Sequence, residues 1–249
     1  MSKILYTIVI FSLCTSCASE YISSPMNIPL FEEKGEALVE AGISTNSVFV
    51  NASYAFSEKY AAILSSDISF YNFSDISDFA PVRGGEAVIF PTGGDIVAHR
   101  TIEAGLGRYN IANVENWHLE CFVGLRYGEA DNTKKENTHN YYFNNWYLQS
   151  FVQINWGKKI KWSELGWVAR IAYSYHENGD VQTYHYSKEL KYTYSNFNMF
   201  HLEPLYFVRF GGKHLKATIR AGFNAGLAWS NGVELYGNPH LSAGLSYRF

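Results

Sequence analysis

The chain closes on the stretch Leu241-Ser-Ala-Gly-Leu-Ser-Tyr-Arg-Phe249, in which every odd-numbered residue is apolar. The even-numbered residues between them are serine, glycine and arginine. Successive side chains of an extended chain point to opposite faces, so this stretch predicts a strand with one apolar face. A soluble domain usually ends in frayed polar residues, whereas this strand keeps its apolar face up to the last residue, Phe249.

The same alternation recurs from residue 34 onward, in segments of about ten residues that are each followed by a turn signal. Apolar faces recur over residues 37–43, 48–56, 62–70, 102–106, 117–127, 146–156, 167–175, 202–210 and 217–223. With the terminal stretch, these segments predict an all-β fold, a transmembrane antiparallel up-and-down β-barrel of about ten strands. The connections alternate in length, which predicts short periplasmic turns, long external loops and both ends of the barrel on the periplasmic side.

Two features favour a membrane barrel over the alternative, a soluble lipocalin-like barrel. The polar faces carry too many charges for the packed core of a soluble sandwich. Aromatic residues also gather at the ends of the apolar faces, as in the aromatic girdles of membrane barrels. The predicted girdle residues are Trp117, Tyr127, Trp146, Trp156, Trp167 and Tyr175.

The composition excludes several classes of function. Beyond the N-terminal stretch, no run of 18 apolar residues is present, which excludes transmembrane helices. A formal net charge of -3 gives no basis for nucleic-acid binding. Glycine-rich phosphate motifs and zinc-type cysteine pairs are absent, so we expect neither a cofactor nor a metal.

The N-terminal residues read as an export signal. Lys3 supplies a positive start, Ile4 to Leu13 form a short apolar segment, and small residues follow. We expect a signal peptide over 1–16, a lipid on Cys17, a periplasmic tether over 17–33 and the barrel over 34–249. An ordinary cleaved signal without lipidation is the alternative.

Four stretches carry a resemblance to a known group: TSCAS (15–19), NIPLFEEKGEALVEAG (27–42), LEPLYFVRFGG (202–212) and GLSYRF (244–249). The chain resembles small outer-membrane β-barrel proteins of Gram-negative bacteria, many of them known only as barrel domains. The resemblance implies a barrel integrated in the outer membrane, with lipid and the barrel-insertion machinery as partners. Its motifs are structural, and it implies no catalytic residue.

Strand parity directs a set of charged side chains into the barrel at similar height. These are Glu40, Glu103, Glu120, Arg170, Glu203 and Arg220. A ten-stranded barrel is narrow, and charges removed from water persist only when they are paired, so we expect a network that fills the lumen. Glu40 is expected to approach His240 when the cylinder closes. A conduction path and an active site are the alternatives.

The long loops are polar and rich in tyrosine. Tyr184, Tyr186, Tyr192 and Tyr194 alternate with polar residues, which predicts that the strands over 167–175 and 202–210 extend as a hairpin above the membrane. Such a rim suits a glycan or protein ligand, although interfacial anchoring and loop packing also explain it. His118, His201 and His240 face inward by parity, but no nucleophile motif accompanies them. We therefore predict a non-enzymatic barrel with a structural or surface-interaction role. The alternatives are a narrow pore for small solutes and a lipid-modifying barrel enzyme.

Overall fold

The computed structural model describes residues 24–45, 47–69, 95–114, 116–136, 139–177, 180–185, 188–193, 197–229 and 233–249. The expected signal peptide and the expected lipidation of Cys17 lie outside these residues.

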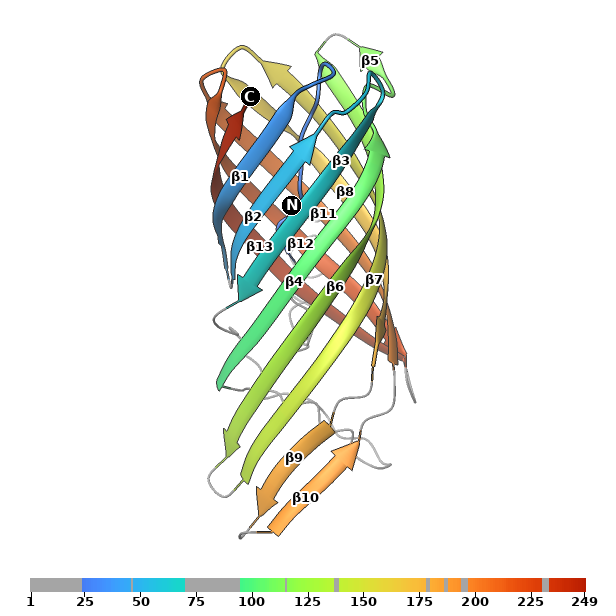
Figure 1. Ribbon diagram of the computed structural model, residues 1–249, viewed down its shortest axis with the longest axis vertical. Helices are drawn as coiled ribbons and strands as arrows, with labels where there is room; N and C mark the ends of the chain where they lie inside the picture. The colour runs from blue at the N-terminus through green and yellow to red at the C-terminus, as the bar shows by residue number, and fades with distance from the viewer. Residues whose placement is uncertain are drawn as a thin grey trace, which may run out of the picture.

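Ten strands form a closed antiparallel barrel, which confirms the predicted fold class (Figure 1). They are β1 (Ala37–Ser44), β2 (Ser47–Tyr54), β3 (Tyr60–Ser69), β4 (Asp95–Arg108), β6 (Trp117–Glu136), β7 (His139–Ile160), β8 (Ser163–His176), β11 (Phe197–Gly211), β12 (Leu215–Trp229) and β13 (Val233–Arg248). The last strand pairs with the first, from Leu38 opposite Arg248 to Ser44 opposite Ser242. The terminal stretch is therefore the closing strand of the cylinder.

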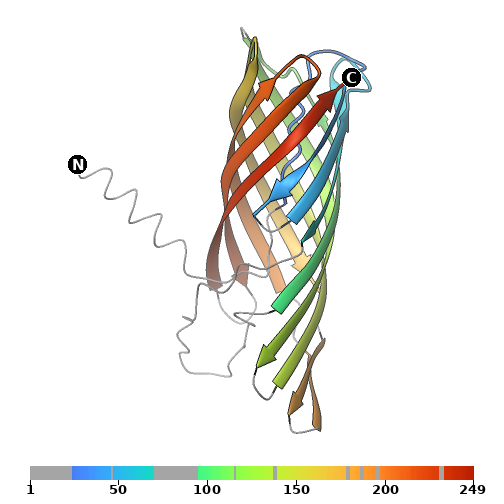
Figure 2. The ribbon, with the colours of Figure 1, turned by 90° about the vertical axis from the view of Figure 1, so that its left-hand side faces the viewer.

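The two ends of the barrel differ. The end where β1 begins and β13 finishes carries short connections, such as the two residues between β7 and β8, and we call it the turn end. The opposite end, the loop end, carries the projecting parts of β6 and β7 (Figures 1 and 2).

Three short strands complete the sheet. They are β5 (Asn113–Val114), β9 (Asp180–His185) and β10 (Lys188–Thr193). β5 pairs with the start of β6. β9 and β10 form a hairpin that continues the sheet beyond the barrel, because β9 pairs with residues 141–144 of β7. This hairpin differs from the expected one: β8 ends at His176 and β11 begins at Phe197, and the hairpin between them is a separate pair of strands that pairs with β7.

The distribution of side chains is the reverse of that in a soluble protein. Leu106 and Leu245 on the outer surface are 60% and 61% exposed, while Arg126, Arg170 and Arg220 inside the barrel are fully buried. An outer surface made of aliphatic side chains on every barrel strand suits contact with lipid, not water. Among the described residues, no helix is long and apolar enough to cross a membrane.

The predicted girdle residues lie in two groups along the barrel. At the turn end, the rings of Trp117 and Trp156 are 5.0 Å apart, and Trp167 lies next to Tyr206. At the loop end, Trp146 lies 6.2 Å from Tyr127 and 6.3 Å from Tyr175. The two groups flank the aliphatic surface, as interfacial aromatic residues do.

The structure describes residues 24–33 of the stretch that the sequence predicts to be a periplasmic tether. Residues 24–31 lie inside the barrel and are buried, and the chain is exposed from Glu32 to Gly35, where it turns into β1. Gly35 adopts a φ of 91°, and its N–H donates to the carbonyl of Ala55, which fixes this reversal. Met26, Ile28 and Leu30 provide apolar side chains that pack against apolar groups of the wall, in a lumen that charged and polar side chains also line. We call residues 24–33 the lumenal segment.

Candidate functional site: the occupied lumen

The lumenal segment runs lengthwise through the barrel. Near the loop end, the hydroxyl of Ser24 donates to the carboxylate of Asp67 on β3, and Thr101 on β4 donates to the same carboxylate. At the turn end, Glu32 forms an ion pair with Lys159 near the end of β7, with 2.9 Å between Oε1 and Nζ. The segment has no regular secondary structure, so its peptide groups need partners from the barrel wall.

Side chains of the wall bind the backbone of the segment on several sides. The N–H groups of Leu30 and Phe31 donate to the carboxylate of Glu120, at 3.2 and 2.7 Å. Gln153 donates to the carbonyl of Asn27 at 2.7 Å, and Arg209 donates to that of Ile28 at 2.8 Å. These bonds satisfy buried peptide groups and fix the height of the segment in the lumen.

Arg248, the penultimate residue, holds the part of the segment closest to the turn end. Its guanidinium donates to the carbonyls of Pro29 and Leu30, at 2.8 and 3.1 Å, and to the carboxylate of Glu36 at 2.8 Å. The closing strand and the lumenal segment are thereby joined by one side chain.

The apolar side chains of the segment pack in two clusters. Met26, Ile28 and Leu30 contact Val168, Leu205 and Phe207 on β8 and β11. Phe31 packs in a second cluster. Its other members are Ala55, Ala61, Ile63, Tyr109, Phe122, Phe151 and Ala172. Leu30 adopts a φ of 51°, a left-handed conformation that a branched residue keeps only when its surroundings enforce it. Its amide, carbonyl and side chain are all held here.

A first charged network lies between β4, β6, β7 and β8. Arg170 forms a two-pronged contact with Glu103, with both N–O distances at 2.8 Å. Arg126 donates to the same carboxylate at 2.6 Å. Arg170 also donates to Gln153 and lies 4.3 Å above the ring of Phe151. Two arginines therefore share one carboxylate, and Gln153 connects this network to the lumenal segment.

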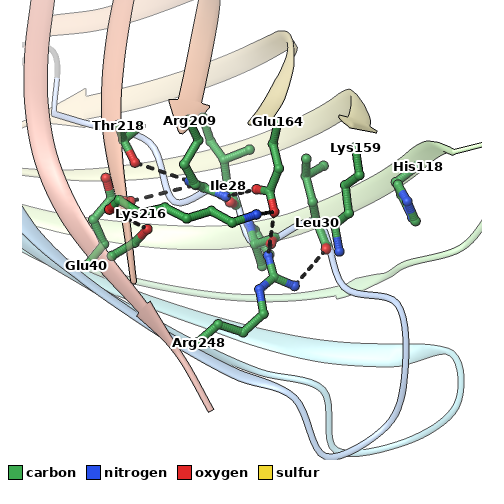
Figure 3. A network of polar contacts seen from close by, with 12 residues as sticks. Ile28, Leu30, Glu40, His118, Lys159, Glu164, Arg209, Lys216, Thr218 and Arg248 are labelled. Atoms are coloured by element: carbon green, nitrogen blue, oxygen red, sulfur yellow. Dashed lines mark hydrogen bonds and ion pairs between the residues drawn. The ribbon is translucent and has the colours of Figure 1, made fainter. Parts of the chain in front are cut away.

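A second network lies nearer the turn end, between β8, β11, β12, β13 and β1 (Figure 3). Glu164 accepts from Arg209 at 2.7 Å and from Lys216 at 2.6 Å. Arg220 donates to Glu40, and Arg209 lies 3.9 Å from the same carboxylate. The carboxylates and the basic side chains of this network are thus in direct contact, and burial of charged groups requires such pairing.

The predicted lumen residues are all buried, but their partners differ from the expectation in part. Glu103 meets Arg170, and Glu40 meets Arg220 on β12; His240 lies on the neighbouring strand. Glu120 binds the backbone of the lumenal segment. Glu203 lies opposite Arg170 in the pairing of β8 with β11.

Sequence reasoning missed several members of these networks. They are Arg126, Gln153, Glu164, Arg209, Lys216 and Arg248. Parity held the signal for most of them, because Arg126 shares a face with Glu120 and Glu164 shares one with Arg170. The lumenal segment itself carried only a weak signal, its apolar residues.

A cluster of histidines lines the lumen near the loop end. The ring of His99 stacks on Tyr147 and shares a hydrogen bond of 2.9 Å with its hydroxyl. Ser174 lies 3.0 Å from His176 and 2.8 Å from His201. All five side chains are buried, and within the described ranges no three His, Cys, Asp or Glu side chains are placed to hold a metal ion.

The Glu32–Lys159 ion pair lies at the turn-end mouth of the barrel. Partial burial tends to raise the pKa of Glu32, but the hydrogen bond and the positive charge of Lys159 outweigh it and hold this pKa below its ordinary value of 4.5. His118 lies 3.8 Å from the same carboxylate. Glu32 therefore stays anionic, and its ion pair with Lys159 fixes the exposed end of the segment to β7. We call this ion pair the clasp.

Comparison with known proteins gives structural matches only. No protein-family model matches the sequence, and no curated protein does. The outer membrane protease OmpT of Escherichia coli matches with a TM-score of 0.52 and 8% identity, over 86% of this chain and 93% of OmpT. The fold is that of outer-membrane β-barrels.

Two further barrels also match, with lower scores. The attachment invasion locus protein Ail of Yersinia pestis has a TM-score of 0.31 and 10% identity, over 87% of this chain and 100% of Ail. The KdgM porin has a TM-score of 0.31 and 10% identity, over 86% of this chain and 99% of KdgM. At these identities the matches concern the fold and transfer no residue roles.

Proposed function

We propose that the protein is an outer-membrane barrel sealed by its own lumenal segment, which serves as a rigid scaffold for a ligand-binding surface at the loop end. The observation that carries this proposal is the burial of residues 24–31 inside the barrel, with their peptide groups bound by wall side chains. The turn end then faces the periplasm and the loop end faces the outside.

Sealing is favoured over conduction because the lumen contains matched groups rather than a one-sided ring of charge. Ion pores use rings of like charge or open water-filled channels. Here Glu103 is bound by two arginines, and Phe31 packs against rings that project from the wall. An ion crossing this barrel would have to displace the segment.

A surface role is supported by the lengths of β6 and β7, which have 20 and 22 residues. A tilted transmembrane strand needs only about 9–11 residues, so roughly half of each strand projects beyond the bilayer. The β9–β10 hairpin extends the same projecting sheet through β7. We propose that this sheet and the tyrosine-rich sequence around it bind a glycan or a protein.

An enzymatic role has less support. Ser174 with His176 and His201 is the arrangement closest to a hydrolytic site, but these side chains are buried in the lumen, where a lipid or protein substrate has no route to them. The likeness to OmpT, a protease, concerns the fold and brings no catalytic residue.

Planar-bilayer recording tests the seal. We expect the wild-type protein to insert without unitary conductance steps. The double variant Ile28→Asp and Leu30→Asp places two unpaired charges against Val168, Leu205 and Phe207, which expels the segment and opens a conducting lumen. The matched control is Ile43→Asp with Ile219→Asp, two charges placed on the lipid-facing surface, which affects insertion but opens no path. Steady conductance of the wild-type protein would establish the pore alternative instead.

A further inference from the structure

The lumenal segment has a definite polarity relative to the membrane. Its first described residue, Ser24, contacts Asp67 and Thr101, which lie between the lipid-facing residues Ile68 and Ile102 near the loop end. Its last buried residue, Phe31, packs on Tyr109 at the turn end, with ring centroids 5.6 Å apart. Ser24 therefore lies at one membrane boundary and Glu32 at the other.

The length of the segment agrees with a complete crossing. Eight residue steps separate Ser24 from Glu32, and an extended chain advances about 3.3 Å per residue, which gives roughly 26 Å. This is close to the apolar band of a transmembrane barrel, about 25 Å tall. The described segment thus traverses the membrane level inside the barrel in a single pass.

A return path toward the turn end is obstructed. A second extended chain beside the first needs about 5 Å in one direction and about 10 Å in the other. At the level of Leu30 and Phe31, that space is filled by Phe207, Phe122 and Tyr109, and all of these side chains are buried. The open direction from Ser24 is the loop end.

We propose that the protein is threaded through its own barrel, with Ser24 at the extracellular mouth and Glu33 at the periplasmic mouth. The inference rests on the orientation given under the proposed function, and it differs from the sequence-based expectation of a periplasmic amino terminus.

Epitope accessibility on intact cells tests the threading. In the full chain, a short epitope is inserted directly before Ser24. The same epitope is placed after Glu136, at the tip of β6, as an extracellular control, and after Lys213, in the turn between β11 and β12, as a periplasmic control. We expect antibody binding to intact cells at Ser24 without loss relative to the Glu136 control. The Lys213 epitope should be detected only after permeabilisation.

A second measurement covers a failure of the epitope variant to insert. The pair Ser24→Cys and Thr101→Cys, in a chain with Cys17→Ser and Cys121→Ser, should form a disulfide because the two hydroxyl oxygens are 3.4 Å apart. The mismatched pair Ser24→Cys and Tyr109→Cys should not. Preferential linkage to Tyr109 would reverse the polarity and overturn the threading.

The outcomes separate this inference from the proposed function. A Ser24 epitope that is detected only after permeabilisation, in a barrel without conductance, would overturn the threading and leave the seal in place. A surface-exposed epitope on a barrel that conducts would support the threading and contradict the seal.

Discussion

At the residue scale, Arg170 joins the charged network to the lumenal segment, through Glu103 on one side and Gln153 on the other. Arg170→Ala leaves a buried carboxylate with one arginine fewer, and breaking a buried pair costs about 3–5 kcal/mol. We expect the barrel to lose much of its heat resistance, measured as the temperature at which its folded gel mobility disappears. Arg100→Ala, which removes an arginine from the outer surface of β4, is the control and should change little. Unchanged stability of Arg170→Ala would indicate a hydrated lumen.

The individual residues of the lumen were predictable only in part. The parity of each strand placed Glu103 and Arg170 inside, and it also held the positions of Arg126 and Glu164. The partners of Glu120 could not be derived this way. They are the backbone N–H groups of Leu30 and Phe31, and every residue except proline has such a group, so the sequence does not mark them. A side chain that binds backbone looks the same in a sequence as one that binds another side chain.

At the scale of elements, the strands followed from alternation because each has one lipid-facing and one lumenal side. The lumenal segment did not, since contacts surround it: Ile28 and Leu30 pack with β8 and β11, while Phe31 packs in a cluster with residues of β3, β6 and β7. A chain enclosed on all sides has no reason to show a period of two. Its prolines, Pro25 and Pro29, also favour an irregular reading from sequence.

The clasp between Glu32 and Lys159 predicts how this element responds to pH. A carboxylate whose pKa is lowered in the folded state contributes stability above its unfolded value, 4.5, and loses it as the pH falls through the lower folded value. We therefore expect current leaks through the wild-type barrel to appear when the turn-end side is brought below pH 4.5. Glu32→Gln should leak to the same extent at all pH values, and Glu33→Gln, its exposed neighbour, should behave as wild type. A pH response that persists in Glu32→Gln would place the sensitive group elsewhere.

At the scale of the whole molecule, the strand that closes the barrel also binds the lumenal segment. β13 pairs with β1 at the seam, and its Arg248 binds the carbonyls of Pro29 and Leu30 inside. The N–H of Phe249 also donates to the carbonyl of Ala37. Residues 248 and 249 together therefore complete the wall of the barrel and bind the lumenal segment. We therefore expect the segment to be in place before this seam closes.

Arg248→Met tests this coupling, because methionine keeps an apolar stem but has no donors for the segment carbonyls or for Glu36. Bonds from charged donors contribute about 1.5–3 kcal/mol each, so we expect a loss of roughly 3 kcal/mol or more. The pairing of β13 with β1 remains, so the barrel should still form, with slower folding into lipid vesicles, a lower melting temperature and transient leaks. Arg108→Met, which removes an outward-facing arginine at the same end of the barrel, is the matched control. Equal folding rates and melting temperatures for the two variants would show that the seam closes independently of the segment, and that the segment is added to a finished cylinder.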